Sequence, residues 1–227
     1  MAKIFIIIPA YNESASIASV IKDIKAANKE WQIVVVDDGS GDETAEFAES
    51  AGAVVLRHLI NRGQGAALKT GTDYAIMNGA AVIVHFDADG QFLANEISDV
   101  IAPIISGQAD IVFGSRFLSA PGGKKSNIPW FKKYVILKLA RLINKIFLGV
   151  SLSDPQSGCR AFSRPAAKEL NWQQDRMAHC SEIMQLAAKS GSRVKEVPIT
   201  IIYHNFGQHF SSGLKILEEF FLGIFTR

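Results

Sequence analysis

The stretch AAVIVHFDADGQ, residues 80 to 91, joins a run of apolar residues to a short acidic segment. The apolar half is typical of a buried β-strand, because a strand that is covered on both faces shows no polar alternation. Asp87, Asp89, Gly90 and Gln91 follow at the point where that strand should end. Two carboxylates and an amide at such a point form either an ordinary turn or part of a ligand shell for a divalent cation.

Comparable apolar runs occur on both sides of this stretch, and segments with helical periodicity separate them. The pattern predicts strands over residues 3–8, 32–36, 53–56, 81–86 and 110–114, and helices over residues 14–27, 44–50, 65–77 and 95–105. We expect Pro9 to end the first strand. Continuous apolar strands that alternate with helices indicate a single α/β domain, with a mostly parallel central sheet and helices on both faces.

The bulk composition limits the classes of protein to consider. The 227 residues are enough for one α/β domain with a substantial core, and the net charge of +2 gives no argument for a nucleic-acid partner. Two cysteines cannot form a disulfide framework, which favours reduced thiols in a cytosolic protein. The amino-terminal residues lack the features of a signal peptide, and no uncharged apolar run reaches the roughly 18 residues that a membrane span needs. We therefore expect a cytoplasmic protein whose membrane contact, if any, is peripheral at the inner face.

Polar, glycine-containing clusters follow four of the predicted strands. They are PAYNES (9–14), DDGSGDET (37–44), NRGQG (61–65) and DADGQ (87–91). In open α/β sheets, ligands bind in the crevice outside the carboxyl ends of the strands. Four clusters on one edge of a sheet predict a ligand site there.

The second and third clusters have the chemistry of a nucleotide site. Asp37 and Asp38 at the end of a buried strand need hydrogen-bond donors or a cation, and a turn explains one of the two at most. The functional interpretation is a carboxylate that accepts a hydrogen bond from a ring N–H of a nucleobase. Gly63 and Gly65 come just before a helix, where backbone N–H groups can approach a phosphate, although the pattern is neither a dinucleotide fingerprint nor a Walker loop. Lys69, one turn further on, contacts that phosphate or is simply solvated.

The acidic segment suits a small hard cation. Side chains alternate along an extended segment, so Asp89 and Gln91 point the same way, and Asp87 shares that face if the segment stays extended. An EF-hand is excluded, because its twelve-residue ligand ladder is missing. A site for Mg²⁺ or Mn²⁺ needs only a few protein oxygens when substrate phosphates and water complete the octahedron.

Six motifs in order carry a resemblance to a known family. They are PAYNES, DDGS, NRGQGAA, DADGQ, GSR (114–116) and DPQSGCRAF (154–162). From about residue 4 to about residue 210 the chain resembles family 2 glycosyltransferases of the GT-A fold, a Rossmann-like architecture. Within that family it looks like the polyprenyl-phosphate (dolichyl-phosphate) mannose or glucose synthases.

The resemblance implies roles for matching residues. It implies nucleotide binding by Pro9, Ala10, Tyr11, Glu13 and Asp37, and metal and diphosphate binding by Asp87, Asp89 and Gln91, with Asp89 and Gln91 as the metal ligands. It also implies acceptor-phosphate binding by Arg116, Ser157 and Arg160, with Asp89 and Arg116 as catalytic residues. These synthases typically carry an Arg where this chain has His204, and this departure leaves the identity of the acceptor open. The imidazole of His204 can still donate to the acceptor phosphate, and an ordinary loop histidine is the alternative.

The implied reaction is an inverting transfer of a hexose from a UDP- or GDP-activated sugar to a polyprenyl phosphate at the cytosolic membrane face. Two alternatives are transfer to a sugar hydroxyl of a glycan or glycolipid, and an inactive nucleotide-sugar binding module. A hydroxyl acceptor requires a general base. Glu182 is the candidate, and it is equally explained as an acid that favours the amino end of a helix.

Two segments bear on the membrane. Residues 130–150 form a basic amphipathic pattern, which predicts either a helix in the headgroup layer or shorter helices packed on the core. We take residues 1–210 as the catalytic domain and residues 211–227 as an apolar helix that contacts a membrane or another copy in a homo-oligomer.

Overall fold

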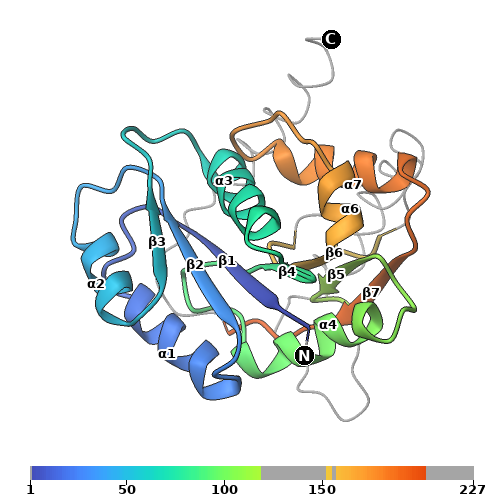
Figure 1. Cartoon of the computed structure of the whole chain (residues 1–227), viewed down its shortest axis with the longest axis horizontal. Coiled ribbons are helices and arrows are strands. Elements are labelled where there is room, and N and C mark those ends of the chain that lie inside the picture. Colours follow the sequence, from blue (N-terminus) through green and yellow to red (C-terminus); the bar gives the residue numbers. More distant parts are fainter. Residues whose placement is uncertain (1, 119–151, 155–156, 203–227) are drawn as a thin grey trace, which may run out of the picture.

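The structure of the protein is a computed structural model, and it describes residues 2–118, 152–154 and 157–202. The described strands form one seven-stranded sheet in the order β3-β2-β1-β4-β6-β5-β7 (Figure 1). They are β1 (Ile4–Ala10), β2 (Gln32–Asp37), β3 (Val54–Arg57), β4 (Val82–His85), β5 (Ile111–Ser115), β6 (Arg160–Ser163) and β7 (Val194–Pro198). Neighbouring strands are parallel except at β6, which runs antiparallel to β4 and to β5. The predicted mostly parallel sheet is confirmed.

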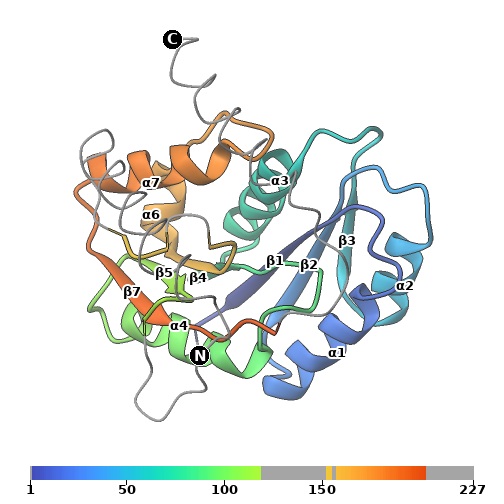
Figure 2. The ribbon, with the colours of Figure 1, turned by 180° about the vertical axis from the view of Figure 1, so that it is seen from behind.

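Helices cover both faces of this sheet, as the two opposite views show (Figures 1 and 2). One face carries α1 (Ile17–Ala27), α2 (Thr44–Ser50), the short 3-10 helix η1 (Ala94–Glu96) and α4 (Ile97–Ile105). The other face carries α3 (Gln64–Met77), α6 (Arg164–Glu169) and α7 (His179–Lys189). The helices and strands that the sequence pattern predicts are present, with ends that differ by up to three residues.

The strand β1 shows why the apolar runs are continuous. Ile4, Ile6 and Ile8 belong to the core on the α1 and α4 face, whereas Phe5 and Ile7 belong to the core on the α3 face. Because alternate side chains of a strand point to opposite faces, a sheet covered on both sides needs an apolar residue at every position. Each fully buried isoleucine contributes roughly 2 kcal/mol.

The prediction that Pro9 ends the first strand is wrong, because β1 continues to Ala10. Ala10 pairs with Asp37, and its carbonyl accepts the N–H of Asp38 at 2.8 Å, so Ala10 faces β2. Pro9 therefore faces the side of β4, and the ladder to β4 has already ended at the pair of Ile7 and His85. No hydrogen bond of the ladder needs the N–H that proline lacks.

Parallel pairing brings the ends of β1, β2, β3 and β4 to one edge of the sheet. Because β6 is antiparallel to both β4 and β5, β5 runs in the same direction as β4, and β7 is parallel to β5. The ends of β5 and β7 therefore lie at the same edge. We call this the carboxyl edge. All the polar clusters of the sequence lie along it.

Some predictions fall outside the described residues. The basic amphipathic segment 130–150, His204 and the apolar segment 211–227 are among them, and the domain boundary at residue 210 stays a prediction. Within the described ranges, no helix combines the length and the apolar character required to cross a bilayer.

Candidate active site

An open pocket of about 510 Å³ lies at the carboxyl edge. Several residues with predicted roles line it: Pro9, Ala10, Tyr11, Glu13, Asp38, Asp87 and Asp89. The other lining residues are Asn61, Gly63, Gln64, Ala67, Ala88, Arg176 and Met177. The loops after β1, β2, β3 and β4 thus converge on one cavity, together with the amino end of α3 and the segment before α7.

The loop after β1 is tied to the loop after β2. The N–H of Asn12 donates to Ser40 Oγ at 2.9 Å, and the N–H of Gly41 donates to Asn12 Oδ1 at 2.9 Å. The N–H of Glu13 donates to Thr44 Oγ1 at 2.8 Å. Asn12 has a φ of 55°, a left-handed conformation that asparagine tolerates better than most residues. These bonds fix the pocket-lining backbone of the first loop.

Asp38 anchors the loop between β3 and α3. Its carboxylate accepts the N–H of Arg62 at 3.0 Å and the N–H of Gly63 at 2.6 Å, and it lies 2.6 Å from His58 Nδ1. A buried carboxylate is stable when it is fully hydrogen-bonded, which explains why an acid can stand directly after a buried strand. Asp38 therefore shapes the pocket wall through the backbone of Gly63.

Three residues that are predicted to bind the nucleotide do not line the pocket. Asp37 is buried, and its Oδ1 accepts a backbone N–H of its own turn at 3.1 Å. Gly65 packs directly against the backbone of the segment 172–178. Lys69 lies 3.5 Å from Asp73 Oδ2, one turn further along α3. Their roles toward a nucleotide stay predictions.

Asp87 and Asp89 form an acidic pair at the end of β4. Gln64 Nε2 donates to Asp87 Oδ1 at 3.0 Å, and the N–H of Gln91 donates to Asp89 Oδ1 at 3.0 Å. Asp87 is partly buried and Asp89 is exposed. Burial, and then repulsion from Asp89, raise the pKa of Asp87 to about 7. The two carboxylates repel each other when both are ionised, and a cation bound at the pair would offset that repulsion.

The donor set of this pair fits a hard cation in part. Within the described residues, no three His, Cys, Asp or Glu side chains gather closely enough to hold a metal ion by themselves. Asp87 and Asp89 are pocket-lining residues and Gln91 is not, so the role of Gln91 as a metal ligand stays a prediction. Mg²⁺ and Mn²⁺ accept such an incomplete set when substrate phosphates and water supply the rest.

The segment before β6 reaches the acidic pair. A Cβ on Gly158 would stand 2.6 Å from Asp87 Oδ1 and nearer still to Oδ2, so a larger residue there would displace that carboxylate. Next to it, Ser157 is buried, and Arg160 Nε donates to the carbonyl of Ser157 at 2.8 Å. Ser157 Oγ and the two terminal guanidinium nitrogens of Arg160 are buried without a hydrogen-bond partner among the described residues. Two predicted acceptor residues thus adjoin the predicted metal site.

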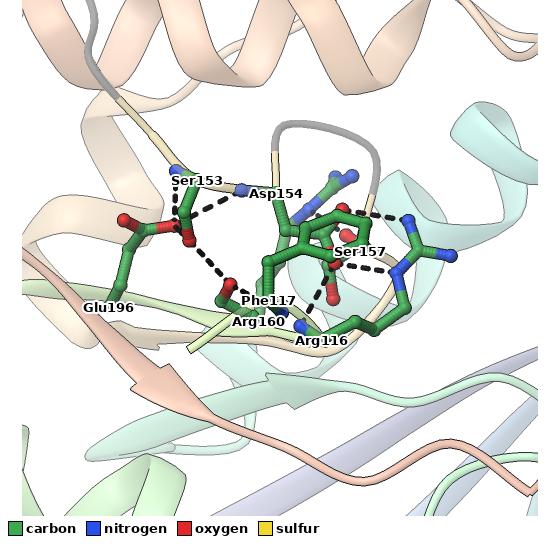
Figure 3. A network of polar contacts seen from close by, with 8 residues as sticks. Arg116, Phe117, Ser153, Asp154, Ser157, Arg160 and Glu196 are labelled. Carbon is green, nitrogen blue, oxygen red and sulfur yellow. Dashed lines mark hydrogen bonds and ion pairs between the residues drawn. The ribbon is translucent and has the colours of Figure 1, made fainter. Parts of the chain in front are cut away.

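Arg116 belongs to a polar network at the end of β5 (Figure 3). Its Nε donates to Asp154 Oδ2 at 2.5 Å, and its Nη2 donates to Asp154 Oδ1 at 2.7 Å. Glu196 accepts the backbone N–H groups of Ser153 and Asp154 at 2.7 and 3.2 Å. A paired, two-point contact holds the guanidinium plane in one orientation. The role of Arg116 toward an acceptor phosphate stays a prediction.

The carboxylate of Glu182 holds a loop. Its Oε2 accepts the backbone N–H groups of Gln173 and Gln174 at 2.9 and 2.8 Å. The same segment, 172–178, carries Arg176 and Met177 into the pocket. Glu182 does not line the pocket itself, and its role as a general base stays a prediction.

The sequence patterns did not single out Arg176, Met177 or Gly158 as site residues. Arg176 and Met177 stand in a polar stretch without a motif, and packing of segment 172–178 against Gly63 and Gly65 brings them to the pocket. Gly158 does stand in the quoted motif DPQSGCRAF, directly after Ser157, so its place in the motif was an available signal.

Comparisons with known proteins identify one family model and several related glycosyltransferases. The family model described as "Glycosyl transferase family 2" matches residues 5–170. The chain is 36% identical over 236 residues to the UDP-N-acetylglucosamine–dolichyl-phosphate N-acetylglucosaminyltransferase of Methanococcus voltae, covering 94% of this chain and 92% of that protein. It is 32% identical over 225 residues to the polyprenol monophosphomannose synthase of Mycolicibacterium smegmatis, covering 95% of this chain and 83% of that one.

A solved structure shows the same fold. The glucosyl-3-phosphoglycerate synthase of Mycobacterium tuberculosis, crystallised with Mn²⁺, UDP-glucose and phosphoglyceric acid, aligns with a TM-score of 0.67 at 20% identity. The alignment covers 95% of this chain and 74% of that one. The predicted GT-A fold is confirmed, and the resemblance that the six motifs carry is confirmed with it.

Proposed function

Because this chain belongs to glycosyl transferase family 2, we propose that it transfers a hexose from a nucleotide-activated sugar to a polyprenyl phosphate. The observation that carries the proposal is that the acidic pair Asp87 and Asp89 shares one open pocket with the loop after β1. The two relatives described above support a lipid phosphate as the acceptor, since their names state a dolichyl phosphate and a polyprenol monophosphomannose.

The pocket offers suitable groups for a UDP- or GDP-hexose donor. Tyr11 lines the pocket with half of its surface exposed, so its ring can stack on a nucleobase. The amino end of α3 lines the pocket at Gly63 and Gln64, and helix amino ends favour anionic groups such as a diphosphate.

Asp87 and Asp89 would hold the cation, Mg²⁺ or Mn²⁺, together with oxygens of the diphosphate and water. A cation bound there offsets the negative charge of the departing nucleoside diphosphate. Gln64 and Gly158 orient the carboxylate of Asp87, the first through a hydrogen bond and the second by leaving it room.

The acceptor chemistry needs few protein groups. An oxygen of the acceptor phosphate attacks the anomeric carbon while the bond to the diphosphate breaks on the opposite face, which inverts the configuration. That oxygen is already anionic, so no general base is required, in keeping with the engagement of Glu182 by two backbone N–H groups. Arg116, held in one orientation by Asp154, is suited to bind the phosphate from the side of β5.

Replacement of Asp89 by alanine tests the donor half of the proposal. We expect at least a 100-fold loss of turnover and the loss of metal-dependent binding of the nucleoside diphosphate in calorimetric titrations. Asp99→Ala, which removes an exposed carboxylate on α4, is the matched control and should leave both unchanged. An unchanged rate in Asp89→Ala would remove the metal assignment.

Product analysis tests the acceptor half. Incubation of the protein with a nucleotide sugar and polyprenyl phosphate should yield a glycosylated lipid phosphate, and free saccharides should remain unmodified. Glycosylation of saccharides alone would establish the alternative, transfer to a hydroxyl. Donor binding without any transfer would establish an inactive binding module.

A further inference from the structure

Exposed apolar side chains gather along the carboxyl edge of the sheet. Leu59 and Ile60 follow β3 and are 102% and 70% exposed. Four further exposed apolar residues lie at the same edge, after β1, β5 and β7 and just before α7: Tyr11, Leu118, Ile202 and Met177. A series of this kind across the whole edge is unlike the isolated apolar residues that any protein surface carries.

The pair Leu59 and Ile60, which we call the apolar tip, is held in place from both sides. His58 on one side and the N–H groups of Arg62 and Gly63 on the other bind the carboxylate of Asp38. His58 is fixed further, because its Nε2 lies 2.9 Å from Thr70 Oγ1. A movement of this loop toward the protein would therefore break several part-buried hydrogen bonds.

The turn after β2 supports the apolar tip from beneath. Gly39 has a φ of 76°, and a Cβ there would stand 2.8 Å from the backbone of Ile60 and of Asn61. The backbone of the tip thus rests directly on that turn. The backbone of the apolar tip is held by these contacts while its two large aliphatic side chains are exposed to water. Exposed apolar side chains of this kind usually contact an apolar partner.

Basic groups accompany the apolar tip. Arg62 follows it directly and has a half-exposed side chain that lies 3.7 Å from Asp175. Arg176 is exposed and lines the pocket close to Met177. Arginine next to exposed aliphatic residues is the combination that lies at the interface of anionic lipids.

We propose that the carboxyl edge docks on an anionic lipid bilayer, with Leu59 and Ile60 inserted among the headgroups and acyl chain ends. The inference rests on the proposed function, because a polyprenyl phosphate sits in a bilayer and the pocket must open toward it. Two highly exposed aliphatic side chains, with further exposed apolar residues along the same edge, suit a lipid surface, whereas a protein partner would need a closely complementary patch. Insertion into lipid explains why Leu59 and Ile60 are exposed although neither lines the pocket.

A site-specific fluorophore tests the contact directly. Cys159 and Cys180 are buried, so a thiol-reactive, polarity-sensitive dye will label an introduced cysteine selectively. Leu59→Cys is the probe variant, and Met77→Cys, which is 77% exposed at the far end of α3, is the matched control. With vesicles of phosphatidylglycerol and phosphatidylethanolamine, the dye at residue 59 should shift to the blue and resist an aqueous quencher, and the dye at residue 77 should not.

Every other outcome overturns the docking surface. Vesicle binding without a shift at residue 59 would show that another part of the chain meets the lipid. Equal shifts at residues 59 and 77 would show unspecific adsorption, and absence of vesicle binding would show that the edge does not dock.

A second pair of variants separates docking from catalysis. Leu59→Asp combined with Ile60→Asp should lower vesicle binding in flotation by at least roughly tenfold, since two aliphatic side chains no longer enter the lipid. Turnover of an acceptor dispersed in detergent should stay within twofold, and Met77→Asp should change neither. If the dye at residue 59 shifts but no lipid phosphate is glycosylated, the proposed function fails while the docking surface stands. If the double variant Leu59→Asp and Ile60→Asp binds vesicles as strongly as the parent does, the proposed docking surface is wrong.

Discussion

Replacement of Gly158 by alanine tests whether the carboxylate of Asp87 must lie where the structure has it. The added methyl carbon would stand 2.6 Å from Asp87 Oδ1 and closer still to Oδ2, whereas an ordinary carbon–oxygen contact is about 3.4 Å. The carboxylate must therefore move by about 1 Å, which also disturbs its hydrogen bond from Gln64 Nε2. Gly158 does not have a positive φ, so alanine adds no backbone strain of its own.

The expected cost falls on function more than on stability. A displacement of about 1 Å in a group that orients the reacting centre costs on the order of 100-fold in rate. We therefore expect kcat/KM to fall roughly 100-fold and the cation-dependent affinity for the nucleoside diphosphate to fall with it. The overpacked contact costs about 1 kcal/mol of folding free energy, because the partly exposed carboxylate can turn away.

Three measurements check this expectation: steady-state kinetics with the lipid acceptor, calorimetric titration of nucleoside diphosphate with Mn²⁺, and thermal unfolding. Gly41→Ala is the control, because a Cβ at Gly41 meets no atom within 4 Å and its backbone is not left-handed. Activity of Gly158→Ala within twofold of the parent, with unchanged diphosphate affinity, would refute the assignment of Asp87 to the donor site.

Three further predictions concern residues around the site and the fold. Glu182→Gln keeps an oxygen that accepts the two backbone N–H groups, so it should retain activity within about fivefold, whereas Glu182→Ala should lose more and should unfold more easily by about 1 kcal/mol. Hydrogen bonds from Arg193 lower the pKa of Asp110 from its ordinary 3.8 to about 2. The resulting stability is therefore fully present above pH 4 and is lost as the pH falls through about 2. Asp110→Asn should cost about 1 kcal/mol at pH 7, after allowance for solvent, and only a few tenths of a kcal/mol, roughly RT ln 2, at pH 2 in chemical denaturation. Arg116→Lys loses the two-point contact with Asp154, so KM for the acceptor should rise at least roughly tenfold while KM for the donor stays unchanged.

Each of these three predictions has a contrary result. Glu182→Gln with a loss of 100-fold or more would identify Glu182 as a general base, because an amide cannot take a proton. A stability difference between Asp110→Asn and the parent that is as large at pH 2 as at pH 7 would exclude the ionised pair as its cause. A parallel rise of both KM values in Arg116→Lys would indicate a general distortion of the pocket.

The sequence by itself determined the fold class and the edge at which the site lies. Apolar strands without alternation require a sheet covered on both faces, and parallel strands bring the polar clusters after Ala10, Asp37, Arg57 and His85 to one edge. Both conclusions follow from local patterns, because the period of the side chains and the order of strands and helices are properties of the chain itself.

Only the tertiary structure decided how individual side chains are used. The strand β6 begins with Arg160 and ends with Ser163, so it carries no apolar run of the kind that marks the other strands. It pairs with β4 on one side and with β5 on the other. The same packing sets Gly158 beside Asp87 and brings Arg176 to the pocket through segment 172–178. Contacts between residues so far apart in the chain depend on how the layers fit together, and no pattern within a short stretch of sequence encodes that fit.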